Sequence, residues 1–193
     1  MINKPRKYDE TVVYEAQERL PAGGYVLNIL GTKIEVFDWG NVLVLRFDIY
    51  EGDYKGFYQK NYNAQQTNQK WKGTYRINLP KDDGSEKDEW AIRKLKSSMT
   101  AVEKSNDGYV WNWDEKSLVG KLVGGLFGNK EYDYEGKRGF YTDCRTLCGV
   151  ERIRSGDFTI PTDKMLNNNT VAASDPYDGF HAYDDEDDSD IPF

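Results

Sequence analysis

The 193-residue sequence has only one histidine and two cysteines. His181 lies in a polar C-terminal stretch, so a triad or general base built on histidine is not expected. Cys144 and Cys148 lie four apart in a strand-like run, and at about 3.3 Å per residue they are too distant for a disulfide. With a single histidine, a zinc site lacks ligands. We therefore expect reduced thiols, no metal and no cofactor.

Long apolar runs are also absent. No stretch approaches the roughly 20 apolar residues of a membrane helix, and the positively charged N-terminus lacks the apolar segment of a secretory signal. We expect a cytoplasmic protein without membrane contact.

No motif of an enzyme is evident. The glycines from Gly120 to Gly125 lack the GxxxxGK[ST] order of a phosphate-binding loop. Acids such as Asp48, Asp53 and Asp114 are scattered, which favours ordinary surface carboxylates over a magnesium-dependent nuclease. The sequence predicts a non-enzymatic protein.

Aromatic residues and charge asymmetry are what the sequence has in abundance. It contains 14 Tyr, 8 Phe and 5 Trp, more rings than one core requires, so some are expected at a surface. Eight of the 33 acidic residues follow residue 173, where there is no Lys or Arg. Removing those eight leaves 25 acids against 26 bases, so a body of net charge +1 precedes a strongly anionic tail. Such asymmetry is typical of an interaction tail.

The body has the patterning of strands. Strand patterns are expected at 25–37, 42–50 and 57–62, and residues 74–79 form a further strand or an extension of the third. One face of the second carries Leu43, Leu45, Phe47 and Ile49. A further strand is expected at 118–127, where glycines suit curvature, and a hairpin at 131–134 and 139–150.

One helix is expected between these groups of strands. Ser85 and Asp88 form an imperfect capping box, and Asn106-Asp107-Gly108 is a stop signal. Ile92, Leu95, Met99 and Val102 fall on one stripe. The order predicts an all-β/α+β fold, an OB-fold: a five-stranded Greek-key barrel with one helix between strands 3 and 4. Other small α+β folds share this order and stay open as alternatives.

We place this domain at residues 1–160. Residues 161–193 contain few apolar side chains and are expected to be a disordered linker and an acidic partner-docking tail. At the very end, Phe193 can fill an apolar pocket while its α-carboxylate meets a basic residue, and Pro192 favours an extended backbone. The candidate partner-binding residues are Asp187, Asp188, Asp190, Ile191, Pro192 and Phe193.

This ending resembles the acidic tip of bacterial single-stranded-DNA-binding proteins, which finish in several Asp followed by Ile-Pro-Phe; here Ser189 interrupts the acids. The stretches 70–90 and 109–121 resemble the single-stranded-DNA-binding proteins encoded among phage and prophage replication genes. The resemblance implies sequence-independent binding and protection of single-stranded DNA in replication, recombination and repair, in a bacterial cell or a phage-infected host. It also implies a tip that recruits replication and recombination proteins. Whether the chain forms a homo-oligomer stays open.

Sequence-tolerant binding needs cations for phosphates and exposed rings for bases. Both interleave most densely from 54 to 76, where Tyr58, Lys60 and Tyr62 share one face of the predicted third strand. Trp39 lies in a loop, Arg46 and Tyr50 lie on the polar face of the second strand, and further rings surround the last hairpin. The candidate DNA-binding residues are Trp39, Arg46, Tyr50, Lys55, Tyr58, Lys60, Tyr62, Lys70, Trp71, Lys72, Arg76, Tyr132, Tyr134, Lys137, Arg138 and Tyr141.

Alternatives remain. The Tyr58–Tyr62 group also fits a partly buried tyrosine pair beside a solvated lysine. We interpret Trp90, Trp111 and Trp113 as packing residues. A strand-annealing recombinase, or a protein whose acidic tail mimics DNA, would also fit parts of the pattern.

Overall fold

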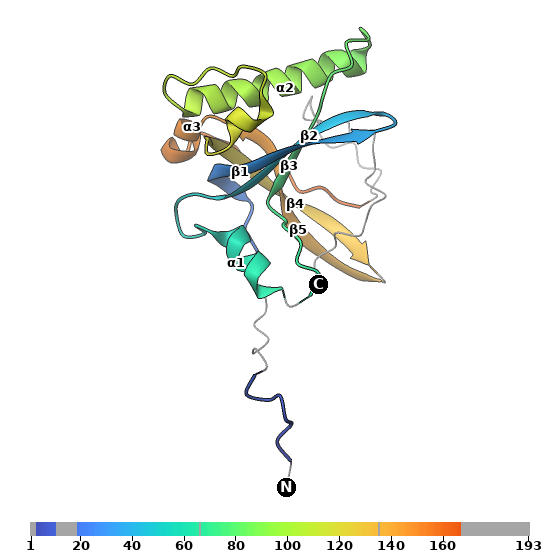
Figure 1. Cartoon of the computed structure of the whole chain (residues 1–193), viewed down its shortest axis with the longest axis vertical. Coiled ribbons are helices and arrows are strands. Elements are labelled where there is room, and N and C mark those ends of the chain that lie inside the picture. Colours follow the sequence, from blue (N-terminus) through green and yellow to red (C-terminus); the bar gives the residue numbers. More distant parts are fainter. Residues whose placement is uncertain (1–2, 11–18, 66, 135, 167–193) are drawn as a thin grey trace.

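The computed structural model describes residues 3–10, 19–65, 67–134 and 136–166 (Figure 1). Its elements are β1 (Gly23–Phe37), β2 (Gly40–Ile49), α1 (Phe57–Ala64), β3 (Thr74–Asn78), α2 (Glu86–Ser105), a 3₁₀ turn η1 (Glu115–Leu118), β4 (Leu122–Tyr134), β5 (Lys137–Cys148) and α3 (Val150–Ser155). The strands form one antiparallel sheet in the order β3-β2-β1-β4-β5. A five-stranded sheet with a long helix between β3 and β4 was predicted, and both are present. No helix in the described ranges is long and apolar enough to cross a membrane.

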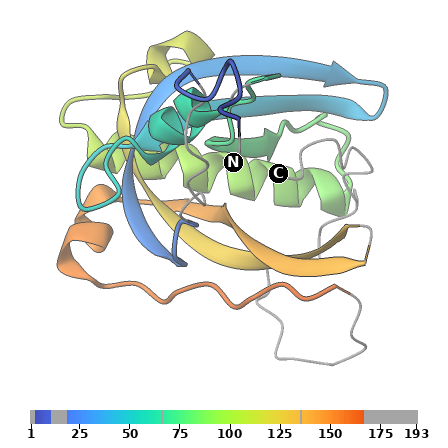
Figure 2. The ribbon, with the colours of Figure 1, turned by 90° about the horizontal axis from the view of Figure 1, so that it is seen from below.

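Two hairpins extend beyond the sheet. β1 pairs with β4 only over Gly23–Asn28 but with β2 as far as Phe37, so the β1–β2 hairpin continues past the shared sheet. β4 and β5 likewise pair out to Tyr134 and Lys137. Figures 1 and 2 show both hairpin ends on the same side of the molecule. The loop between β1 and β2 and the loop between β4 and β5 therefore lie at one end of the fold.

The core lies between the curved sheet and α2. The four predicted core residues of β2 are all buried, and they pack with Phe127 of β4 and Leu27 of β1. On α2, Leu95, Met99 and Val102 are buried as predicted, and the Ser85 side chain accepts a hydrogen bond from the Asp88 amide. Ile92 was predicted in this stripe and is 43% exposed. Ala91 is buried instead, together with Asp88, which lies three residues earlier on the same face of the helix.

The predicted strand at 57–62 is wrong, because this segment forms helix α1. The cause lies in the preceding strand: the Asp48 carboxylate, which is buried, accepts hydrogen bonds from the backbone amides of Tyr58 (2.9 Å) and Gln59 (3.1 Å). Gly56 adopts the left-handed conformation that turns the chain into the helix. An acceptor for free amides at a helix start is the usual capping interaction.

The predicted strands at 118–127 and 131–134 are corrected to one strand. Residues 115–118 form η1, capped by Asp114, and β4 then runs without interruption from Leu122 to Tyr134. The curvature predicted from the glycines agrees with an irregularity in this segment, since the β4–β5 register shifts between Leu126 and Phe127. The glycines also permit close approach: a methyl group added at Gly124 would come within 2.9 Å of the Cys148 sulfur. The last hairpin and the free cysteines were predicted correctly. Helix α3 was not predicted.

After α3 the chain returns along the sheet. The Lys164 amide donates to Asn129 (2.9 Å), and the Glu131 amide donates to Lys164 (2.8 Å), so this segment lies beside β4 where β1 no longer pairs with it. Figure 2 shows the segment running along the lower edge of the sheet toward the β4–β5 hairpin. The sequence-based boundary near residue 160 falls inside this segment.

Candidate nucleic-acid interface

The solvent face of β1, β2 and β3 combines cations with flat rings. The strand register places Lys33 and Arg76 on either side of Val44, and Gly31 and Thr74 on either side of Arg46. Partners in antiparallel strands project to the same side, and the neighbouring positions Leu43, Leu45 and Ile77 point into the core. Lys33, Arg46 and Arg76 therefore lie on the outer face.

Arg46 covers an indole that is held in place. Its guanidinium lies 4.6 Å from the centre of the Trp71 ring. The Trp71 ring nitrogen donates to the carbonyls of Phe47 and Gly73, each at 3.1 Å, which fixes the half-buried ring against the edge of β2. Tyr62 of α1 lies beside the same ring, at 5.7 Å between centroids. The sequence predicted Arg46, Tyr62 and Trp71 separately, and the fold brings them together.

A second group lies at the tip of the β1–β2 hairpin. The rings of Phe37 and Trp39 are stacked at 4.9 Å and 7° between planes, and Arg76 lies 5.8 Å from the Phe37 centroid. We call Phe37, Trp39, Arg46, Trp71 and Arg76 the outer strip. Four of its five residues were predicted from the sequence, namely Trp39, Arg46, Trp71 and Arg76. Phe37 was not predicted.

One carboxylate interrupts the positive charge of this face. Glu35 accepts from Arg76 at 2.7 Å and from Lys33 at 3.4 Å. Partial burial alone would raise the pKa of Glu35, but hydrogen bonds and charge from Arg76 and Lys33 outweigh burial and hold the pKa below its usual value. Glu35 is therefore ionised at neutral pH and competes with any phosphate for both cations.

Tyr58 is corrected from a candidate contact to a core residue. It is 6% exposed, and its ring meets Phe47 edge-on at 5.5 Å. On a helix Tyr58 and Tyr62 share a face while Lys60 projects elsewhere, so the predicted common face of these three residues does not exist. The alternative with a buried tyrosine and a solvated lysine describes this segment better.

The remaining candidates of this region are dispersed. Lys60 and Lys70 are exposed, and Lys72 is half-buried. Tyr50 and Lys55 lie past the other end of β2, where the Lys55 amine is 5.8 Å from the Tyr50 ring. This pair is separate from the outer strip.

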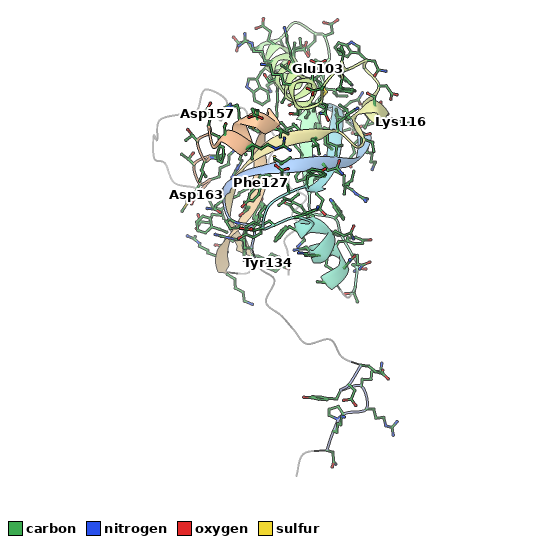
Figure 3. The ribbon with its side chains drawn as sticks, turned by 90° about the vertical axis from the view of Figure 1, so that its left-hand side faces the viewer. Glu103, Lys116, Phe127, Tyr134, Asp157 and Asp163 are labelled. Atoms are coloured by element: carbon green, nitrogen blue, oxygen red, sulfur yellow. The ribbon has the colours of Figure 1, made fainter. Side chains whose placement is uncertain are left out.

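The β4–β5 hairpin carries a second set of rings. Its register pairs Lys130 with Tyr141, Tyr132 with Gly139, and Tyr134 with Lys137, which places all these side chains on one face. Tyr132 and Tyr141 lie 6.4 Å apart, and the Lys130 amine is 5.8 Å from the Tyr141 ring. Figure 3 shows Tyr134 at the far end of β4, well beyond the core residue Phe127.

Arg138 lies on the opposite face of this hairpin, where it pairs with Asp133 at 2.9 Å. Arg138 was predicted as a contact together with Lys137 because both residues belong to the last hairpin. The strand register places Lys137 on the face of the tyrosines and Arg138 on the other face.

Trp113 contradicts its interpretation as a packing residue. It is 77% exposed and has a left-handed backbone (φ +68°), while Trp111 packs against the core at 4.6 Å from the Trp113 ring. Trp90 is half-buried and lines a pocket with Trp39. Phe37, Glu35 and Lys130 were not predicted, although alternation along each strand was sufficient to place them on these faces.

The candidate tip residues 187–193 lie outside the described residues. No protein-family model matches the chain, and no curated protein matches it.

Proposed function

We propose that this protein binds single-stranded DNA, without sequence preference, on an OB-type barrel. The sheet order supports the barrel: β3 and β5 are the two edges of the sheet and approach each other, so the strands almost close in the order 1-2-3-5-4. The position of α2 between β3 and β4 fits the same architecture. In OB-folds the face of strands 2 and 3, together with the loop between strands 1 and 2 and the loop between strands 4 and 5, receives oligonucleotides.

The observation that carries the proposal is the outer strip. Here two guanidinium groups lie over rings, Arg46 on Trp71 and Arg76 on Phe37, on the face of β2 and β3. Cations for phosphates beside rings for bases are what sequence-tolerant binding requires. DNA rather than RNA, and roles in replication, recombination and repair, are supported by the resemblance of the C-terminal tip, which we propose recruits partner proteins.

The test is an oligo-dT titration of the full chain and of two matched arginine variants. Arg46→Gln removes a cation of the outer strip, whereas Arg93→Gln removes one from the exposed face of α2, where Arg93 pairs with Glu89. We expect Arg46→Gln to weaken binding several-fold and to lower the slope of log K against log salt by about 0.7, the value for one phosphate contact. Arg93→Gln is expected to bind as the wild type does.

Failure of the wild-type chain to bind oligo-dT at low salt would refute the proposal and favour the DNA-mimic alternative. Equal losses in the two variants would refute the outer strip as the contact surface. Accelerated pairing of complementary strands by the wild type would indicate the annealing recombinase.

A further inference from the structure

Gly31 lies on the outer face of the sheet, next to Arg46 of the outer strip. The two residues are partners in the β1–β2 register, and the register shifts between Ile29 and Gly31, so Leu30 is the extra residue of a β-bulge. Leu30 is exposed, and the next residue of β1 on the outer face is Lys33. Gly31 therefore leaves a gap without a side chain beside Arg46.

The backbone conformation does not require a glycine at position 31. The φ angle of Gly31 lies outside the left-handed region, unlike the φ angles of Gly52 and Gly56. The type of bulge that needs glycine holds that residue in the left-handed conformation, and other bulges have no such requirement. Glycine is otherwise disfavoured in strands. Neither the bulge nor the local conformation therefore explains this glycine.

Packing inside the protein does not require a glycine there either. A methyl group added at Gly31 would meet no atom within 4 Å in the part of the chain that the structure describes. At Gly73, by contrast, an added methyl group would clash with the Phe47 carbonyl. Glycine within a strand also marks places where a ligand or another backbone approaches closely. The open gap at Gly31 therefore indicates an approach from outside the described part of the chain.

We propose that the sugar–phosphate backbone of the bound strand crosses β1 at Gly31, with a phosphate on Arg46. The inference rests on the proposed function, because Arg46 belongs to the outer strip that receives the strand. Without a β-carbon at position 31, the strand lies against the backbone of β1 while it reaches the guanidinium. A larger side chain fills the gap and lifts the strand away from Arg46. Gly31 is thus a positioning residue that sets the distance between strand and sheet.

The experiment titrates full-length Gly31→Ala and Gly31→Val with oligo-dT. Gly149→Val is the matched control, because Gly149 has an ordinary φ (−65°), a methyl group added there meets no described atom within 4 Å, and it precedes α3, outside the outer strip. Forcing extra methyl groups into an occupied space costs a factor of roughly 5 to 100. We expect that loss of affinity for Gly31→Val, a smaller one for Gly31→Ala and none for Gly149→Val.

Two further measurements separate positioning of the strand from an effect on folding. The urea midpoint of Gly31→Ala should equal or exceed that of the wild type, because alanine tolerates the φ angle at this position and restricts the unfolded chain. The losses of Gly31→Val and Arg46→Gln should not add in the double variant, because both changes remove the same phosphate contact. Additive losses, or a lowered midpoint that accounts for the loss of affinity, would contradict the positioning role.

Three other outcomes overturn the inference in different ways. If Gly31→Val binds as tightly as Gly149→Val while Arg46→Gln is weakened, the strand does not cross β1 here and the proposed function stands. If the wild type binds no oligo-dT, both proposals fail. If Gly31→Val lowers the molar mass of the DNA-free protein in solution, the gap receives a second copy of the chain instead of the strand.

Discussion

Tyr25 shows how one residue makes stability depend on pH. Its hydroxyl donates to the Pro21 carbonyl at 2.8 Å, and its ring meets Tyr54 and Phe127 edge-on. Burial, and next the charge of Tyr54, raise the pKa of Tyr25 from 10.0 to about 12. The folded protein therefore keeps this proton at a pH where the unfolded chain loses it. The resulting stability is complete below pH 10 and is lost as the pH rises through about 12.

We predict that Tyr25→Phe is less stable than the wild type by about 0.5–1.5 kcal/mol at pH 7, the value of one hydrogen bond. The difference should shrink as the pH rises above 10, since only the wild type loses the contribution of this proton. Urea unfolding of both proteins between pH 7 and 11 measures it. Tyr58 and Tyr75, whose pKa values burial also raises, are present in both proteins and cancel in the comparison. A difference that stays constant with pH would contradict the assignment.

Single residues were predictable where strand alternation decides their surroundings. Alternation correctly placed Phe47 in the core and Arg46 on the solvent face. The same rule applied to β1 places Lys33 on the solvent face as well. It could not show that Trp71 folds back under Arg46, because that contact depends on hydrogen bonds from the indole to Phe47 and Gly73. Such a contact joins a loop to a strand more than 20 residues earlier in the sequence.

At the scale of elements, the prediction failed where a distant side chain selects the structure. The segment 57–62 has β-compatible residues, and Asp48, nine positions before its start, converts it into α1 by capping its first amides. Pattern analysis examines neighbours along the chain and has no access to that carboxylate. α2 was predictable because its cap, stripe and stop signal all lie within its own sequence. The structure of a segment can be predicted from sequence when its own local signals all favour the same element.

Glu35 limits what the outer face of β1–β3 can bind. We predict that Glu35→Gln binds oligo-dT several-fold more tightly at low salt, because Arg76 and Lys33 lose their shared acid and become available to phosphates. The gain should fade as salt is raised, since exposed charges are screened. The matched control is Glu51→Gln, which breaks an ion pair with Arg154 beyond the other end of β2. An equal gain in both variants would show that only net charge matters.

The whole molecule joins a nearly neutral body to an anionic tail. The last described residue, Leu166, donates its amide to the Glu131 carboxylate at 3.0 Å, so the described chain ends beside the β4–β5 hairpin, which also carries Tyr132 and Tyr134. The acids that follow in the sequence are tethered at this point, and tethering raises their effective concentration near the hairpin. With a body of only +1, affinity depends on local cations, and the tail acids can occupy them.

We therefore predict that replacing Asp184, Asp185, Glu186, Asp187 and Asp188 with their amides, in the full chain, strengthens oligo-dT binding at low salt. At high salt the affinities of variant and wild type should converge, because tail and strand compete through the same screened charges. The comparison is a titration across salt concentrations, with Phe193→Ala as the control that keeps every acid. That control is expected to bind DNA as the wild type does, since the ring serves partner docking. Equal affinity of the amide variant and the wild type at every salt concentration would exclude competition by the tail, and the cations of the outer strip would then be open to DNA at all times.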